Sequence, residues 1–314
     1  MLTGTIRRQV PMRLIRLVLP FVLLALLWHL LDGPEIVARL SDADPLWLSL
    51  SMVAALLQFP FLAFRWRLTA GALGHPIPRG QAVKEYFVAQ LVNQTLPGGM
   101  LGDAARVVRT QKQASLGTAT GAVVIERLAG QVTLLLVTLA GLVLAHVLPG
   151  GVVWPEGTAT VVAWCLGAAA VVLAVAALAW RTRPDTGRRL ASSLRRAVFA
   201  RGIWPRQVIL SLGVVACNLS TFYFAARAIG VTLPPEAAVT LVPLVLTAML
   251  VPLTIAGWGF REGAAAGLLP LAGVASEPAV AASIVFGAVI LAASLPGVFW
   301  LAPADEDDEP TKAR

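Results

Sequence analysis

The chain has 314 residues, of which 57% are hydrophobic and only 13% are charged, and its mean hydropathy is +0.77. Soluble domains carry about 25% charged residues, so this composition excludes a soluble domain and predicts a membrane domain with about eight helical spans of ~20 residues each. The formal net charge of +8 does not indicate a nucleic-acid-binding protein, because the arginines lie in short segments between apolar runs.

Long windows without charged residues mark the membrane spans of a predicted all-α, polytopic fold. The first span follows a basic N-terminal segment and is expected to remain uncleaved. The second begins after Asp44-Pro45, a helix cap followed by proline in the first helical position. The predicted spans are, in chain order, Leu17–Leu31, Leu46–Phe64, Leu128–Leu148, Thr158–Trp180, Val208–Ala226, Ala237–Phe260 and Pro278–Ala304.

Basic residues are concentrated in three segments that alternate along the chain. Residues 1–16, 65–112 and 181–206 together hold 19 of the 25 Lys and Arg residues. Because cytoplasmic loops are enriched in Lys and Arg, we expect these segments and both termini to face the cytoplasm, in a bacterial inner membrane. Residues 1–304 form one predicted transmembrane domain, and the acidic residues 305–314 are expected to be a disordered cytoplasmic tail.

The segment Tyr86–Arg109 interrupts this pattern of simple spans. A helix with a polar stripe that includes Asn93 is expected to stop at Pro97-Gly98-Gly99, and Gly102-Asp103 then begins a second helix that carries Arg106 and Arg109 on one face. A helix N-terminus with adjacent arginines is suited to an anion such as phosphate. The alternative is a cytoplasmic loop whose arginines anchor to lipid headgroups.

The segment Val251–Gly263 repeats this order of residues. Pro252 is followed by Gly257 and Gly259 and then by Arg261-Glu262. Two apolar segments interrupted by proline and glycine are typical of a transporter site between inverted repeats near mid-membrane. The residues expected to act as hinges in them are Pro97, Gly98, Gly99, Gly102, Pro252, Gly257 and Gly259. The alternative is that Pro and Gly are simply frequent in membrane helices.

Glu126 and Arg127 directly precede the uncharged window Leu128–Leu148. Neighbouring residues on a helix do not face one another, and an ionisable group at membrane depth needs a partner. We therefore expect Arg106 or Arg261 to pair with Glu126, and Asp103 or Glu262 to pair with Arg127.

No metal site, cofactor motif or catalytic set is recognisable. Cys165 and Cys217 lie apart in apolar stretches, and the three histidines lie beside no carboxylate cluster. Gly257, Gly259 and Gly263 have the wrong spacing for a dinucleotide fingerprint. The sequence therefore predicts neither a metal nor a cofactor.

Three short motifs make the chain resemble the membrane domain of lysylphosphatidylglycerol synthases, a flippase-like family. The first is Asn93 and Pro97 followed by Gly102-Asp103-x-x-Arg106, the second is Glu126-Arg127-Leu128, and the third is Gly259-x-Arg261-Glu262-Gly263. The resemblance covers nearly the whole chain and implies translocation of a lipid or a lipid-linked substrate. Two-domain members carry a further aminoacyl-transferase domain, which is not found here, so lysyl transfer is not expected.

We therefore expect a flippase or transporter whose partners are membrane lipids or a lipid-linked substrate, working alone, as a homo-oligomer or within a biosynthetic complex. The predicted substrate-binding residues form one polar chamber between the broken helices: Asn93, Asp103, Arg106, Glu126, Arg127, Arg261 and Glu262. Two alternatives are an intramembrane enzyme that acts on a lipid-linked phosphate through Asp103 or Glu126, and a non-transporting subunit of a lipid or glycan biosynthesis complex.

Overall fold

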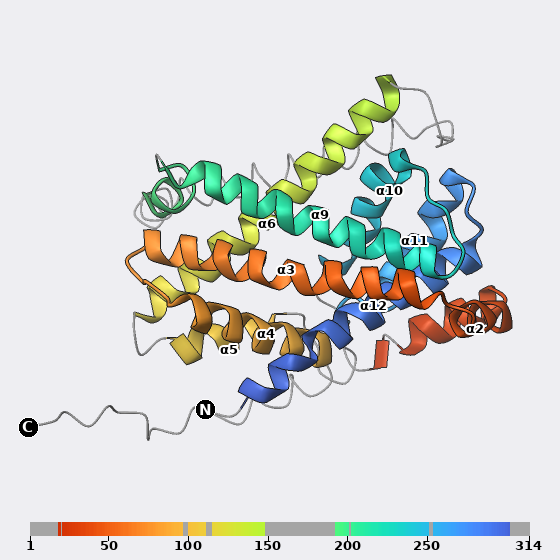
Figure 1. Cartoon of the computed structure of the whole chain (residues 1–314), viewed down its shortest axis with the longest axis horizontal. Coiled ribbons are helices and arrows are strands. Elements are labelled where there is room, and N and C mark those ends of the chain that lie inside the picture. The colour runs from red at the N-terminus through yellow and green to blue at the C-terminus, as the bar shows by residue number, and fades with distance from the viewer. Residues whose placement is uncertain are drawn as a thin grey trace, which may run out of the picture.

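The computed structural model describes residues 18–19, 21–96, 100–110, 115–147, 192–200, 202–250 and 254–301. All regular elements within these ranges are helical, as predicted (Figure 1). Four of these helices are long and apolar enough to cross a membrane, or five spans result if one bent helix pair counts as a span. The predicted span Thr158–Trp180 lies outside the described residues.

The first predicted span, Leu17–Leu31, is part of the bent pair rather than a simple crossing. A helix over Phe21–Leu30 is followed by α2 (Gly33–Ser41) at an angle of 103°. Asp32 causes the change of direction, because its carboxylate accepts a hydrogen bond from the Glu35 amide at 3.2 Å and so caps a new helix.

The four long helices are α3 (Pro45–Ala72), α6 (Leu116–Val147), α9 (Trp204–Ala228) and α12 (Ser276–Ser294), which continues into η4 (Leu295–Trp300). The Asp44 cap of α3 is confirmed, since its carboxylate accepts the Leu46 amide at 2.8 Å. α3 continues beyond the expected end at Phe64, and α6 begins before the expected start at Leu128. Charged residues that were expected at helix ends therefore lie inside helices.

Both segments with proline and glycine interruptions consist of short helices. The first forms α4 (Arg79–Thr95) and α5 (Leu101–Thr110); the second forms α10 (Pro235–Thr247), η2 (Ala248–Leu250), α11 (Phe260–Leu268) and η3 (Leu269–Ala272). The predicted interruption of the apolar window Ala237–Phe260 is therefore confirmed, since α10, η2 and the start of α11 share it.

The predicted hinge residues have different roles. Gly257 and Gly259 have φ angles of +77° and +89°, which glycine adopts readily. Gly102 was expected to be a hinge but lies inside α5, where a side chain would collide with the backbone of Ala89 on α4. Its absent side chain therefore permits close packing of the two helices. Pro97, Gly98, Gly99 and Pro252 lie outside the described residues.

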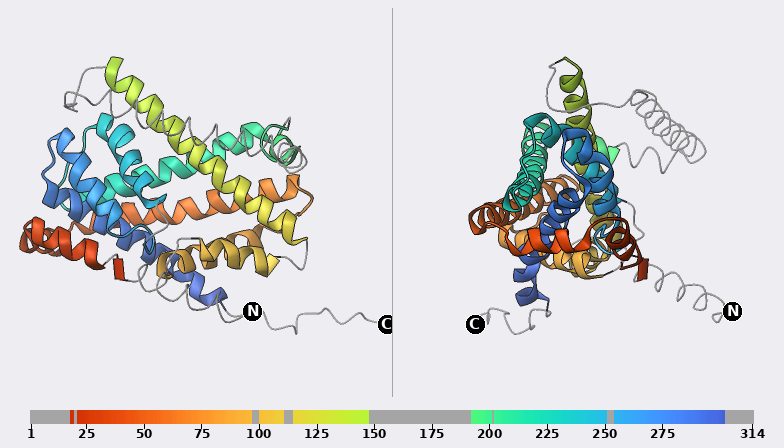
Figure 2. Two further views of the ribbon diagram at one scale, coloured as in Figure 1. Left: turned by 180° about the vertical axis from the view of Figure 1, so that it is seen from behind. Right: turned by 90° about the vertical axis from the view of Figure 1, so that its right-hand side faces the viewer.

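α3 and α9 lie side by side and run in opposite directions (Figure 1). At one end the Asp44 amide donates to the Ala228 carbonyl at 2.7 Å, and at the other end Gln207 Nε2 donates to Thr69 Oγ1 at 2.9 Å. α6 crosses this pair obliquely, as Figure 2 shows from behind. α4 packs against α3, α5 and α12, and α10 packs against α9, α11 and α6.

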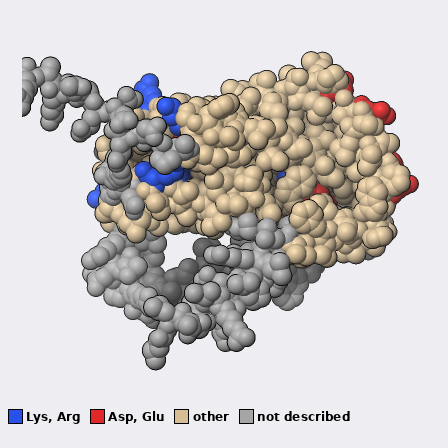
Figure 3. Space-filling view, turned by 90° about the horizontal axis from the view of Figure 1, so that it is seen from below, with Lys and Arg blue, Asp and Glu red and all other residues tan. Residues whose placement is uncertain are grey.

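Charged side chains are separated along the long axis of the molecule. In the view of Figure 3, Lys and Arg gather at one end and Asp and Glu at the opposite end, with a mostly uncharged surface between them. The basic end is the one at which α3 finishes and α9 begins (Figures 1 and 3). This uncharged band is the surface expected of helices in contact with lipid.

Candidate functional site

Five charged side chains from α3, α5 and α6 form a buried network. Glu126 is fully buried and accepts a hydrogen bond from Arg65 Nε at 3.0 Å and another from Arg106 Nη2 at 3.4 Å. Arg106 Nη2 also donates to Asp103 Oδ1 at 2.8 Å, and Asp103 Oδ2 pairs with Arg127. Of the alternatives predicted for each residue, Glu126 thus pairs with Arg106 and Arg127 with Asp103, while the further partner of Glu126, Arg65, was not predicted.

Aromatic side chains fix Arg106 within this network. Its guanidinium lies over the rings of Trp66 and Tyr86, 4.4 Å and 4.3 Å from their centroids, and the residue is only 1% exposed. The Tyr86 hydroxyl donates to Glu126 Oε2 at 3.1 Å. Cation–π contacts of a desolvated guanidinium are strong, so the two rings stabilise Arg106 in a position where it contacts only its protein neighbours.

The network carries more positive than negative charge. Three guanidinium groups face two carboxylates, which leaves one positive charge when all five groups are ionised. Arg65, Arg106, Asp103 and Glu126 are buried, whereas 36% of the Arg127 side chain is exposed. The excess charge is therefore accessible at Arg127.

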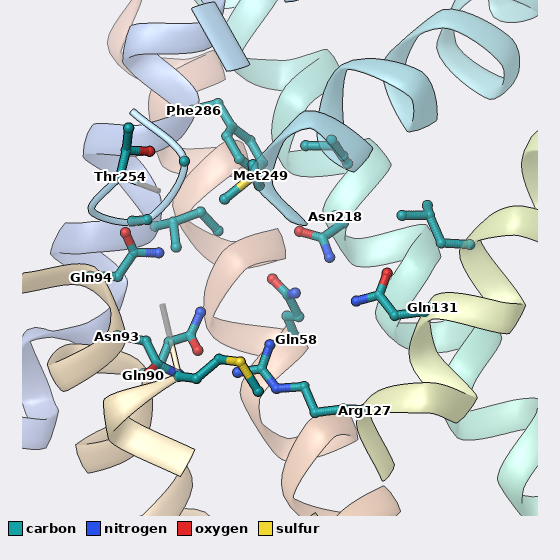
Figure 4. A pocket seen from close by; sticks show the side chains of 16 residues that line it. Gln58, Gln90, Asn93, Gln94, Arg127, Gln131, Asn218, Met249, Thr254 and Phe286 are labelled. Carbon is teal, nitrogen blue, oxygen red and sulfur yellow. The ribbon is translucent and has the colours of Figure 1, made fainter. Parts of the chain in front are cut away.

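Arg127 lies on the wall of a cavity of about 390 Å³, a size typical of small-molecule sites. Figure 4 shows amide side chains from several helices pointing into the same space. The lining residues are Gln58, Gln90, Asn93, Gln94, Met100, Arg127, Gln131, Leu134, Asn218, Leu246, Met249, Thr254, Ala256, Gly257, Phe286 and Ile290. Gln58 and Asn218 lie near the midpoints of α3 and α9, so the cavity lies about halfway along the two helices.

Asn93 has a structural role as well as a place in the cavity wall. Its Oδ1 accepts a hydrogen bond from the amide of Gly102 at 2.8 Å, which satisfies a donor at the start of α5. Asn93 therefore connects the two halves of the first broken segment.

Arg261 and Glu262 form a second, separate group. Arg261 Nε donates to Glu262 Oε1 at 3.0 Å and to Ser283 Oγ at 2.9 Å, while Glu262 Oε2 accepts the Gly259 amide at 2.6 Å. The Arg261 guanidinium lies over the rings of Trp258 and Phe286, 4.9 Å and 5.2 Å from their centroids.

The prediction of one chamber with all the charged residues is therefore corrected. Within the described residues no hydrogen bond or ion pair joins Arg261 or Glu262 to the first network, and neither residue lines the cavity. Phe286, which does line it, packs against the Arg261 guanidinium. The second group therefore contacts the cavity wall through Phe286.

The helical spacing predicted that Arg109 would share the surroundings of Arg106, and this prediction is wrong. It pairs with Glu85 on α4 at 2.7 Å and donates to the Trp300 carbonyl of η4 at 3.0 Å. Its contacts join α5 to neighbouring helices, away from the cavity.

Arg65 and Gln58 on α3 were not recognised as site residues from the sequence. Arg65 was assigned to a loop because the uncharged window ends before it. The absence of Gly or Pro between Arg65 and Ala70 indicates that the helix continues, and this signal would have placed Arg65 at membrane depth. Among the described residues, no group of three His, Cys, Asp or Glu side chains is placed to hold a metal ion.

A sequence profile described as "Lysylphosphatidylglycerol synthase TM region" matches residues 13–297. The match includes every described helix up to α12, both charged groups and the cavity. It confirms the resemblance indicated by the three short motifs. No curated protein matches the chain.

Proposed function

This chain belongs to the family of lysylphosphatidylglycerol synthase transmembrane regions, and we propose that it moves an anionic phospholipid or lipid-linked substrate across the bacterial inner membrane. The observation that carries the proposal is the unbalanced positive charge at Arg127, in a polar cavity halfway along the long helices. Charged side chains at membrane depth are costly and commonly mark a substrate pathway. A guanidinium is also the side chain best suited to a phosphate.

The helix arrangement supports two inverted repeats. α3, α4, α5 and α6 correspond in order and length class to α9, α10, α11 and α12: a long helix, two short helices and a second long helix. The contacts of the two sets correspond as well. α4 packs against α3 and α5 of its own set and against α12 of the other set, and α10 packs against α9 and α11 of its own set and against α6 of the other set. The opposite directions of α3 and α9 support an inverted relation between the two sets. Such repeats allow alternating access around a central site.

The carboxylates favour transport over the enzymatic alternative. Glu126 accepts hydrogen bonds from Arg65 and Arg106, and Asp103 pairs with Arg106 and Arg127. The oxygens of both carboxylates are thus engaged by arginine donors and are not open to a proton of the substrate. Neither Asp103 nor Glu126 is therefore suited to be the general base of a lipid-modifying reaction.

The proposed orientation places the basic end of the molecule in the cytoplasm. We expect a cysteine at Arg195, which is exposed near the start of α9, to be labelled by an impermeant maleimide only after the cells are permeabilised. A cysteine at Asp42, exposed at the acidic end, should be labelled in intact cells. Both variants are made with Cys165 and Cys217 replaced by serine. The reverse labelling pattern would contradict the orientation.

The proposed activity is tested with the purified chain in liposomes that contain a fluorescent anionic phospholipid. We expect the label to become accessible to an impermeant quencher faster than in protein-free liposomes, since a charged headgroup crosses the apolar core slowly by itself. Lipid extracted afterwards should be chemically unchanged. A chemically altered lipid would support the enzyme instead, and neither change would support the non-transporting subunit.

A further inference from the structure

Four buried polar atoms on the cavity wall have no hydrogen-bond partner among the described residues. They are Gln58 Oε1, Gln94 Oε1, Thr254 Oγ1 and Arg127 Nε. Gln58, Gln94 and Thr254 are 6%, 7% and 1% exposed, respectively. Buried polar atoms are nearly always paired, and the side chains that carry these four atoms line the same cavity, so a polar ligand in it can supply their partners.

A ligand that pairs with these atoms must offer an acceptor to Arg127 Nε and donors to the oxygens of Gln58 and Gln94. A phosphodiester offers only acceptor oxygens, which suit the guanidinium of Arg127. It cannot satisfy the oxygen of Gln58 or Gln94, because an acceptor needs a hydrogen-bond donor. As the two amides are oriented in the structure, the buried atom without a partner is the acceptor oxygen in each case.

The donor that fits the cavity is a hydroxyl group. An ammonium group also donates, but no Asp or Glu lies among the residues that line the cavity, and the adjoining network already has excess positive charge. An ammonium would therefore be desolvated without a counterion, which is unfavourable. Hydroxyl groups are uncharged and both donate and accept, as the amides of Gln90, Gln131 and Asn218 also do.

We propose that the cavity recognises a headgroup that combines one phosphodiester with an uncharged moiety rich in hydroxyl groups, such as glycerol or a sugar ring. This inference rests on the proposed transport function and names its substrate class. Arg127 binds the phosphate, while Gln58, Gln94 and Thr254 bind the hydroxyl groups. Lipids that carry only phosphate, or phosphate with an ammonium group, leave these side chains unpaired.

The test compares lipids that differ in one property. Phosphatidylglycerol and phosphatidylpropanol have the same charge and the same three-carbon headgroup, but phosphatidylpropanol lacks the two hydroxyl groups. We expect phosphatidylglycerol to be translocated at least about tenfold faster, because a site built for hydroxyl groups rejects analogues that lack them. Phosphatidylinositol, with its hydroxyl-bearing ring, should also exceed phosphatidylpropanol, and phosphatidylethanolamine should not. Equal rates for phosphatidylglycerol and phosphatidylpropanol would overturn the inference while leaving the transport function intact.

Leucine variants connect this selectivity to the cavity. Gln58→Leu and Gln94→Leu should each reduce the ratio of the phosphatidylglycerol rate to the phosphatidylpropanol rate toward one. Gln207→Leu is the matched control, because Gln207 is also a buried glutamine with an unpaired Oε1 but does not line the cavity. Its ratio should equal that of the wild type. A ratio that falls equally in all three variants would contradict the assignment.

A binding measurement separates this inference from the transport function. In detergent micelles, phosphatidylglycerol should raise the melting temperature of the protein more than phosphatidylpropanol does, since a ligand that binds the folded state stabilises it. This difference should disappear in Gln58→Leu and persist in Gln207→Leu. Absent translocation with selective binding would refute the proposed function alone. Equal stabilisation by the two lipids would refute the recognition of hydroxyl groups.

Discussion

Replacing Glu126 with glutamine is expected to lower the free energy of unfolding by about 3–5 kcal/mol, the cost typical of removing one partner of a buried ion pair. Glu126 is fully buried and accepts hydrogen bonds from Arg65 and Arg106. The variant retains the volume of the side chain but leaves three arginines facing only Asp103. We expect a clearly lower melting temperature in detergent and a reduced yield of folded protein.

Glu35→Gln is the control for this loss of stability. Glu35 also pairs with an arginine, Arg39, at 2.8 Å, but 42% of its side chain is exposed. Exposed pairs contribute about 0–1 kcal/mol, so this variant should melt close to the wild type. Combining Glu126→Gln with Arg65→Met should restore part of the lost stability, because one uncompensated charge is removed. Equal melting temperatures for Glu126→Gln and Glu35→Gln would contradict the buried network.

Replacing Arg127 with glutamine is expected to reduce the rate of lipid translocation by about 10–100-fold, the value of one hydrogen bond to a charged group. Arg127 is the partly exposed guanidinium of the network and lies on the cavity wall. Without it, two guanidinium groups face two carboxylates, and the excess positive charge is lost. Asp103 retains Arg106 as a partner at 2.8 Å, so the protein should remain folded.

Arg39→Gln is the matched control for Arg127→Gln. The two arginine side chains have the same exposed fraction, 36%, and each pairs with a carboxylate. Arg39 lies on α2 and does not line the cavity. Its replacement should leave the translocation rate at the wild-type value, measured by quenching of a fluorescent phospholipid. A similar loss of rate in both variants would indicate a general effect of removing positive charge.

The helical class and the two interrupted segments could be predicted from the sequence because their signals are local. Uncharged windows indicate membrane helices, and prolines and glycines within them predict interruptions. Gly257 and Gly259 lie between η2 and α11. One partner of Glu126 and one of Arg127 were among the two alternatives predicted for each, since an ionisable residue at membrane depth requires an opposite charge. Few opposite charges occur within the apolar segments.

Other features depend on contacts between distant segments and could not be predicted in this way. The uncharged window of α3 ended at Arg65, yet this arginine is buried because Glu126, far along the chain, pairs with it. The separation of Arg261 from Arg106 follows from Glu262, its own neighbour, whose position in the first turn of α11 allows pairing with both Arg261 and the Gly259 amide. The rule that neighbouring residues on a helix do not face one another therefore does not apply at the start of α11.

The central claim, that excess positive charge at the cavity moves an anionic headgroup, is tested most directly by the translocation rates of Arg127→Gln and of the double variant Asp103→Asn/Arg127→Gln. In the double variant, Arg65 and Arg106 face Glu126 alone, so one positive charge is again in excess. We predict that Arg127→Gln loses translocation of phosphatidylglycerol and that the double variant does not recover it, because Arg65 and Arg106 are buried and neither lines the cavity. Wild-type translocation by Arg127→Gln, or recovery of translocation in the double variant, would contradict the account.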